Sequence, residues 1–237
     1  MCKLESYETV LNRAQGCLLG QLAGDALGST VEFQTPKEIT KRYPQGIRDL
    51  EGGGIWNILP GQPTDDSEMA LLLARMLADQ RRYDPEEARK AYLFWMDSDP
   101  FDRGLTISRG LRERLNFESQ ANGAMMRISP LGIFGANHDW EHVAKWARQD
   151  AAITHPHPVC QQANALFTMA IAHAIRQGCD ARNLYEQIVT WAGDMEVDES
   201  LLEAVRGPAE APPAQDVGGT PKETGLTKIF LESIFAR

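Results

Sequence analysis

The sequence of 237 residues predicts an all-α fold, and two patterns support this prediction. Apolar residues recur every three to four positions through most of the chain, which is the spacing of an amphipathic helix, whereas the period-two alternation typical of strands is hard to find. The hydrophobic content of 43% is enough for one large core in a chain of this length. We therefore expect a single helical domain.

The first predicted helix covers about residues 10–26. Its broad apolar stripe consists of Val10, Leu11, Ala14, Cys17, Leu18, Leu22 and Ala26. Gly16, Gly20 and Gly24 recur every four residues on the same helix. Because small residues at this spacing let another helix approach closely, we expect this helix to lie at the centre of the fold.

The remaining elements are separated by glycine and proline. Residues 48–62 contain four glycines and a proline and predict a loop, which leads to a clear helix start at residues 64–68. An apolar run over residues 69–77 continues that helix. A second loop is predicted over residues 122–135. Further helices are predicted over residues 84–96, 103–115, 139–152, 158–177 and 180–193.

The composition changes after Val205. Residues 207–221 are rich in proline and glycine, which predicts a linker without regular structure. Residues 226–235 form a short amphipathic end. We therefore expect a helical domain over residues 1–206, followed by a linker and a short tail over residues 207–237.

The charge of the chain limits its partners. A formal net charge of −9 at pH 7 gives an acidic surface that repels nucleic-acid backbones and anionic lipid, so neither is an expected partner. No stretch approaches the ~20 apolar residues of a membrane span, and residues 1–15 lack the apolar run of a signal peptide. We therefore expect a soluble, cytoplasmic protein. Its four cysteines lack metal-ligand spacing and two of them fall in strongly apolar helical patterns, so we expect buried free thiols rather than disulfides.

The segment best suited to metal binding is residues 61–66, where Thr64, Asp65 and Asp66 stand at the mouth of a helix. Two adjacent carboxylates beside a hydroxyl are hard oxygen ligands for Mg²⁺, Mn²⁺ or Ca²⁺. These residues alone favour a structural interpretation over metal binding. Asp65 followed by Glu68 resembles a capping box, and acidic residues favour a helix N-terminus in any case.

Two further carboxylates follow the end of the first helix. Asp25 lies beside glycines at the end of a nearly apolar helix, so its carboxylate is costly to bury unless it binds a cation or accepts several hydrogen bonds. Glu32 lies between Val31 and Phe33, an apolar setting suited to general acid/base chemistry. The alternative for Glu32 is an exposed position in a loop.

Two later segments are candidates for ligand binding. The Asn-Gly pair that opens residues 122–127 exposes backbone N–H groups that can hold phosphate or ribose oxygens, and Arg127 is a natural anion partner. An ordinary turn, with the methionines in the core, is the alternative. His155 and His157 are separated by Pro156, which forces an extended path, so a helix N-terminus is favoured over a zinc site.

Taken together and in this order, these segments resemble the ADP-ribosylglycohydrolase family, which includes dinitrogenase-reductase-activating glycohydrolases and eukaryotic ADP-ribosyl-acceptor hydrolases. Residues 16–28 with Glu32 resemble the opening helix of the family, and residues 63–71 resemble its first metal motif. Residues 122–132 resemble its ADP-ribose loop, and residues 154–156 its next signature.

The resemblance covers about residues 10–205 and implies a compact bundle of many helices. It also implies an enzyme that removes ADP-ribose from a modified protein or small-molecule conjugate, with ADP-ribosyl-arginine as the expected substrate. The residues implied to bind one side of a cluster of two Mg²⁺ or Mn²⁺ ions are Thr64, Asp65 and Asp66. Glu32, or Asp25 nearby, corresponds to the acidic residue close to the scissile bond. The residues implied to line the ADP-ribose pocket are Asn122, Gly123, Ala124, Met125, Met126, Arg127, Ile128 and His155.

The sequence departs from the family in one respect. Family members carry near the C-terminus a Gly-Asp-Thr-Asp-Thr type motif that completes the metal cluster, and nothing of that form follows residue 205. We therefore expect the C-terminal part of the fold to be incomplete. Loss of about half the protein ligands should weaken metal binding severely. The alternative to a hydrolase is thus a truncated or degenerate relative that binds ADP-ribose weakly or not at all.

Overall fold

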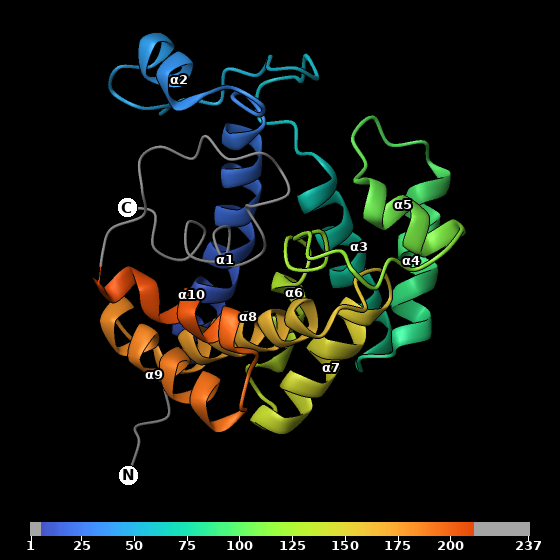
Figure 1. Ribbon diagram of the computed structural model, residues 1–237, viewed down its shortest axis with the longest axis vertical. Helices are drawn as coiled ribbons and strands as arrows, with labels where there is room; N and C mark the ends of the chain where they lie inside the picture. The colour runs from blue at the N-terminus through green and yellow to red at the C-terminus, as the bar shows by residue number, and fades with distance from the viewer. Residues whose placement is uncertain (1–5, 211–237) are drawn as a thin grey trace.

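The computed structural model describes residues 6–210, and this part of the chain contains helices and no strands, which confirms the all-α prediction (Figure 1). A single antiparallel bridge joins Gly53 to Ile58. The helices are α1 (Tyr7–Gly28), α2 (Pro36–Arg42), α3 (Asp65–Gln80), α4 (Pro85–Asp97), α5 (Leu105–Arg112), α6 (Ser129–Gly135), α7 (Trp140–Ala152), α8 (Pro158–Gln177), α9 (Ala181–Asp194) and α10 (Glu199–Glu210). Within these residues, no helix combines the length and apolarity that a membrane crossing requires.

The centre of the fold is α8, which packs against α1, α6, α7 and α9 and buries more than half of its residues. Two core clusters meet on it. The first joins α8 to α7, α9 and α10, and the second joins α3, α4, α5 and α6. Two glycines of α6 allow this packing: a Cβ on Gly132 would meet Ile171 at 2.6 Å, and one on Gly135 would meet Val143 at 2.8 Å.

The expectation that the first helix is central is wrong. Ala26 is the only residue of α1 that is buried within the described part of the chain. A Cβ added to Gly16, Gly20 or Gly24 would meet no other atom within 4 Å there, so these glycines do not receive a neighbouring helix. Instead, Gly20 and Gly24 border an open cavity.

The predicted loop over residues 122–135 is also wrong in its second half, because Ser129–Gly135 forms α6. Proline near the first position of this short helix favours its start, and its glycines are held by tertiary contacts that a sequence pattern does not reveal. The prediction missed α2 and α10 as well. Since α10 ends at Glu210, the first residues of the predicted linker are helical, while residues 211–237 lie outside the described part of the chain.

The loop over residues 48–62 is confirmed, and it presses against the end of α1. Gly52 and Gly54 have φ angles of 73° and 68°. A Cβ on Gly54 would collide with the backbone oxygen of Ser29, so only glycine allows this approach. This close approach places Trp56 within hydrogen-bond distance of the carboxylate of Glu32.

We predict that Gly110→Ala lowers the free energy of unfolding by about 1–3 kcal/mol, because the new Cβ would overpack α5 against the backbone before α8. That Cβ would lie 2.9 Å from Cα and 3.0 Å from the carbonyl oxygen of Thr154. Gly193→Ala is the matched control, since its Cβ meets nothing within 4 Å and should raise stability by about 0.5–1 kcal/mol. Urea denaturation of both variants measures the difference, and equal effects would contradict the close contact.

Candidate functional site

The carboxylate of Asp25 joins the end of α1 to the beginning of α3. It accepts hydrogen bonds from the hydroxyl of Thr64 at 2.7 Å and from the backbone N–H groups of Thr64 and Ser67 at 3.0 and 3.2 Å. Thr64 is the N-cap residue of α3 but makes no capping bond with its own side chain. Asp25 therefore caps α3 from another helix, and several hydrogen bonds compensate for its partial burial.

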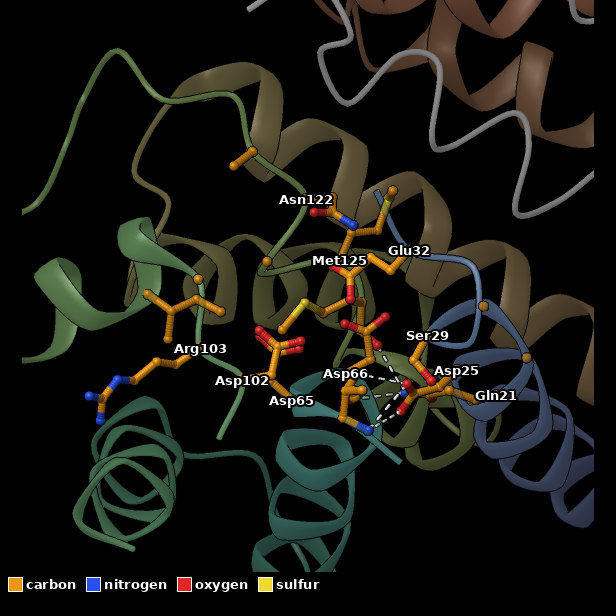
Figure 2. A pocket seen from close by; sticks show the side chains of 18 of the residues that line it. Gln21, Asp25, Ser29, Glu32, Asp65, Asp66, Asp102, Arg103, Asn122 and Met125 are labelled. Atoms are coloured by element: carbon orange, nitrogen blue, oxygen red, sulfur yellow. Dashed lines mark hydrogen bonds between the residues drawn. The ribbon is translucent and has the colours of Figure 1, made fainter. Parts of the chain in front are cut away.

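Because Asp25 supplies the cap, the acidic residues of the first turn of α3 have other surroundings. The capping-box interpretation of Asp65 and Glu68 does not hold: the carboxylate of Glu68 accepts a hydrogen bond from the indole N–H of Trp95 at 2.8 Å. Asp65 and Asp66 face a cavity instead (Figure 2). Gln21 strengthens this junction, since its amide donates to the backbone oxygens of Asp66 and Met126 at 3.1 and 2.9 Å.

A cavity of about 1100 Å³ lies between α1, α3, the segments before α5 and α6, and α8. Its walls bring together most of the candidate residues, although these lie far apart in the sequence. The candidates that line it are Asp25, Glu32, Thr64, Asp65, Asp66, Asn122, Gly123, Met125, Met126 and His155. Ala124, Arg127 and Ile128 do not line it: they are 2%, 0% and 0% exposed and lie in the core.

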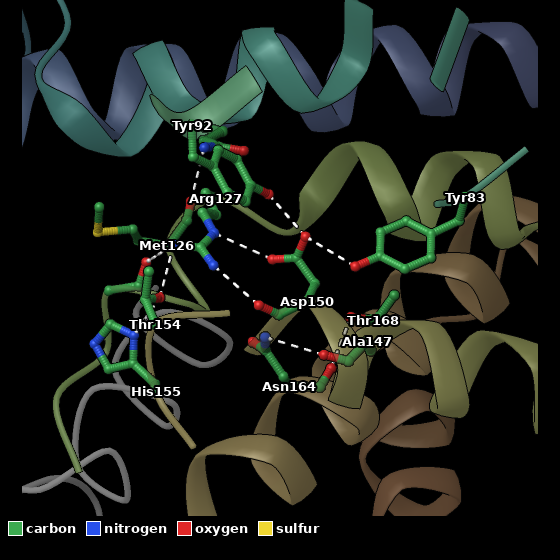
Figure 3. Close-up of polar contacts among 12 residues, drawn as sticks. Tyr83, Tyr92, Met126, Arg127, Ala147, Asp150, Thr154, His155, Asn164 and Thr168 are labelled. Atoms are coloured by element: carbon green, nitrogen blue, oxygen red, sulfur yellow. Dashed lines mark hydrogen bonds and ion pairs between the residues drawn. The ribbon is translucent and has the colours of Figure 1, made fainter. Parts of the chain in front are cut away.

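The burial of Arg127 corrects the expectation that this residue meets an anion directly. Its Nε pairs with the carboxylate of Asp150 at 3.1 Å, and its guanidinium lies over the ring of Tyr92, 4.1 Å from the centroid (Figure 3). Both members of the ion pair are fully buried. The guanidinium is therefore turned away from the cavity and contributes to the packing behind it.

Three carboxylates give the cavity its electrostatic character. Burial and the charge of Asp25 raise the pKa of Asp65 to about 6. Burial and then the charge of Asp65 raise the pKa of Asp66 as well. Burial and the charge of Asp65 raise the pKa of Asp102 to about 7. Burial and mutual repulsion therefore disfavour the charged forms of these three carboxylates.

Nearby basic side chains do not neutralise this group. Arg103 extends away from the carboxylates in Figure 2 and pairs with Asp99 at 2.7 Å. Within residues 6–210, Asp65, Asp66 and Asp102 form no ion pair with a basic residue. Such a site favours a ligand that arrives with a cation.

The sequence prediction missed Asp102 and Trp56. Asp102 immediately precedes the predicted helix over residues 103–115, where an acidic residue is commonplace. Trp56 lies in the glycine-rich loop and donates its indole N–H to Glu32 at 2.8 Å. Phe33 is 76% exposed and does not enclose Glu32, so the hydrogen bond from Trp56 holds this carboxylate rather than an apolar pocket.

The two histidines before α8 have separate roles. His157 is the N-cap residue of α8, and its Nδ1 accepts a hydrogen bond from the backbone N–H of Val159 at 3.1 Å, as expected for a helix N-terminus. His155 is fully buried, and burial together with the charge of Arg127 lowers its pKa to about 3. In the part of the chain that the structure describes, no three His, Cys, Asp or Glu side chains are grouped closely enough to hold a metal by themselves.

The helical fold and the large acidic cavity define a class of all-α proteins with a ligand site between helices. Within this class, the chain belongs to the ADP-ribosylglycohydrolase family, because residues 6–232 match that family. This match extends to residue 232, whereas the motifs in the sequence resemble the family only as far as about residue 205.

Two relatives and one solved structure illustrate the similarity. The ADP-ribosyl-[dinitrogen reductase] glycohydrolase of Rhodospirillum rubrum is 38% identical over 177 residues, which cover 70% of this chain and 59% of the relative. The ADP-ribosylarginine hydrolase Tri1 of Pseudomonas putida is 31% identical over 144 residues, covering 54% and 37%. An ADP-ribosylglycohydrolase-related protein complex shares the fold with a TM-score of 0.80 at 24% identity, over 97% of this chain and 76% of that one. The chain thus spans less than two thirds of the length of these two relatives.

We predict that Asp25→Ala lowers the free energy of unfolding by about 2 kcal/mol, because the first N–H groups of α3 lose their acceptor. Asp79→Ala is the control: Asp79 is an exposed acidic residue of the same helix α3, and its loss should change stability by no more than about 0.5 kcal/mol. Denaturant titration compares the two. Equal effects would contradict the capping role of Asp25.

We further predict that His155 makes the protein sensitive to acid. The pKa of His155 is about 3 in the folded state and 6.5 in its reference state, so between these values the unfolded chain binds a proton that the folded chain does not. Its contribution is present above pH 6.5 and is lost as the pH falls toward 3. Between pH 7.5 and 5, the wild type should lose about 2 kcal/mol more stability than His155→Gln. Parallel stability curves for the two proteins would refute this.

Proposed function

We propose that this chain removes ADP-ribose from a modified target in the cavity between α1, α3 and α8, with ADP-ribosyl-arginine as the substrate. The observation that carries this proposal is the group of uncompensated carboxylates in the cavity at the N-terminus of α3. The volume of this cavity, about 1100 Å³, accommodates a nucleoside diphosphate sugar. Membership of the ADP-ribosylglycohydrolase family supports the reaction, and the name of the Pseudomonas relative supports arginine as the acceptor.

We propose Thr64, Asp65 and Asp66 as ligands of Mg²⁺ or Mn²⁺. The donors fit such an ion because they are hard oxygens, and because a divalent cation offsets the burial and the mutual repulsion that raise the pKa values of both aspartates. Mg²⁺ needs only one or two carboxylates when water and substrate oxygens complete its coordination, so a protein group of three acidic ligands is not required. The bound ion would supply charge neutralisation beside an anionic nucleotide and help to orient a water molecule.

Two carboxylates of the cavity are suited to proton transfer. Glu32 is held by Trp56 and is half-buried, so its orientation is fixed while its second oxygen stays available. Asp102, with a pKa of about 7, exchanges protons near neutral pH. We propose that one of these two carboxylates accepts a proton from the water that attacks the anomeric carbon as the glycosidic bond breaks. Asp25 has a different role, because its oxygens are occupied by the hydrogen bonds that cap α3.

The second candidate function is binding of ADP-ribose without turnover. One observation favours it: within residues 6–210 the acidic side chains do not by themselves form a group of metal-ligand size. A chain of this kind would hold the nucleotide through the segments around Asn122 and His155 and would lack metal-dependent catalysis.

We predict that the double variant Asp65→Ala/Asp66→Ala lowers kcat/KM for Mg²⁺-dependent release of ADP-ribose from a labelled arginine conjugate by about 100-fold or more. The control is Glu86→Ala/Glu87→Ala, an adjacent acidic pair in the first turn of α4 that does not line the cavity and should leave release unchanged. Without metal, the Asp65→Ala/Asp66→Ala protein should be at least as stable as the wild type, because buried like charges are removed.

Calorimetric titration with ADP-ribose separates the two candidate functions. Release by the wild type that the aspartate pair abolishes supports the hydrolase. Binding of ADP-ribose by the wild type without any release, over a range of Mg²⁺ and Mn²⁺ concentrations, supports the binding protein. Neither release nor binding would overturn both.

A further inference from the structure

A chain of buried polar groups reaches the wall of the cavity from behind. Arg127 Nη1 donates to the hydroxyl oxygen of Thr154 at 3.0 Å, and the same oxygen lies 2.8 Å from Nδ1 of His155 (Figure 3). All three residues have no exposed surface, but His155 also lines the cavity. The first two residues therefore act on the cavity only through the third.

The position of Arg127 is fixed on several sides. Its Nε donates to the carboxylate of Asp150 at 3.1 Å, and its Nη2 donates to the backbone oxygen of the same residue at 3.0 Å. The hydroxyl of Tyr92 donates to the other carboxylate oxygen at 2.8 Å. A guanidinium has donors only, so the hydroxyl oxygen of Thr154 must accept from Arg127.

This constraint decides the direction of the next hydrogen bond. A threonine hydroxyl has one hydrogen, and in the described part of the chain its remaining partner is Nδ1 of His155. If Nδ1 carried the proton instead, the hydroxyl hydrogen would be left in a fully buried place without an acceptor, which is unfavourable. The hydroxyl therefore donates to Nδ1, and in a neutral imidazole the proton then resides on Nε2.

The imidazole stays neutral, because burial and the nearby charge of Arg127 disfavour its protonated form. Its Nε2 has no hydrogen-bond partner among residues 6–210, although the atom is buried. In Figure 3 this end of the ring points away from Thr154 and from the Arg127 pair. A buried N–H group without a partner at a cavity wall can donate a hydrogen bond to an acceptor of a bound ligand.

We infer that Arg127 and Thr154 are positioning residues that fix His155 in its Nε2–H tautomer, so that the cavity offers a neutral hydrogen-bond donor to an oxygen or ring nitrogen of ADP-ribose. The inference rests on the proposed function for the identity of the ligand, but the tautomer belongs to the protein alone. Arg127 thus serves the nucleotide site without touching the nucleotide. A ligand group that can only donate is rejected at this position.

The tautomer can be read directly in the ligand-free protein. Long-range ¹H–¹⁵N correlation spectra of the ¹⁵N-histidine-labelled full chain distinguish Nε2–H from Nδ1–H, and the signal missing from His155→Gln assigns this residue among the five histidines. We expect the Nε2–H pattern for His155, unchanged between pH 6 and 8. An Nδ1–H pattern, or a mixture of the two, would overturn the inference even if every variant failed to fold.

Three variants test the role of the hydroxyl. Thr154→Val removes the donor to Nδ1 and should abolish the single tautomer and weaken ADP-ribose binding by about 10-fold in calorimetry. Thr154→Ser keeps the hydroxyl and should restore both. Thr168→Val is the matched control: Thr168 is equally buried, but its hydroxyl donates to the backbone oxygen of Asn164 and does not line the cavity, so tautomer and affinity should be unchanged.

The outcomes separate this inference from the proposed function. If Thr154→Val leaves the tautomer and the affinity as in the wild type, the positioning role of Arg127 and Thr154 is wrong while the hydrolase proposal stands. If the tautomer is Nε2–H and depends on Thr154, but the wild type neither binds nor releases ADP-ribose, the positioning role stands, its assigned ligand is refuted, and the proposed function fails with it.

Discussion

The arrangement of the site depends on one interaction, the capping of α3 by the carboxylate of Asp25. An N-cap residue normally satisfies the first N–H groups of its own helix, but Thr64 does not do so here. Because the acceptor comes from α1, the hydrogen bonds fix the end of α1 against the start of α3. The first-turn aspartates are then not needed to accept hydrogen bonds from the backbone N–H groups of their own helix. Their carboxylates remain directed into the cavity, where the positive end of the helix dipole partly offsets their charge.

The placement of cations in the core reinforces this arrangement. The buried guanidinium of Arg127 belongs to an ion pair with Asp150, and Arg103, which lines the cavity, is paired with an exposed aspartate. Neither charge reaches Asp65 or Asp66. The fold therefore leaves the acidic cavity uncompensated, an arrangement that destabilises the empty protein. Under the proposed hydrolase function, an anionic nucleotide alone would be repelled by these carboxylates, so the ion and the nucleotide would bind together.

The sequence was sufficient where the pattern is local. Helix periodicity predicted the all-α fold, glycines predicted the loop before α3, and ten of the thirteen candidate residues from the ordered motifs line one cavity. It was insufficient where tertiary contacts decide. The helical state of Ser129–Gly135 depends on contacts with α7 and α8, and the burial of Arg127 depends on a carboxylate 23 positions away. Asp102 resembled an ordinary acidic residue before a helix, because its burial and its proximity to Asp65, which raise its pKa, arise only in the tertiary fold.

The two sides of the cavity are built on different physical principles. The side formed by His155 and Gly123 is closely packed: a Cβ on Gly123 would lie 2.9 Å from the imidazole, and the backbone of Thr154 lies directly against Gly110. Groups that cannot move discriminate ligands by hydrogen-bond direction. The side formed by the carboxylates has shifted pKa values, which suit proton transfer. Recognition and chemistry can thus be altered separately, because the residues that fix the imidazole share no hydrogen bond or ion pair with those that hold the carboxylates within the described chain.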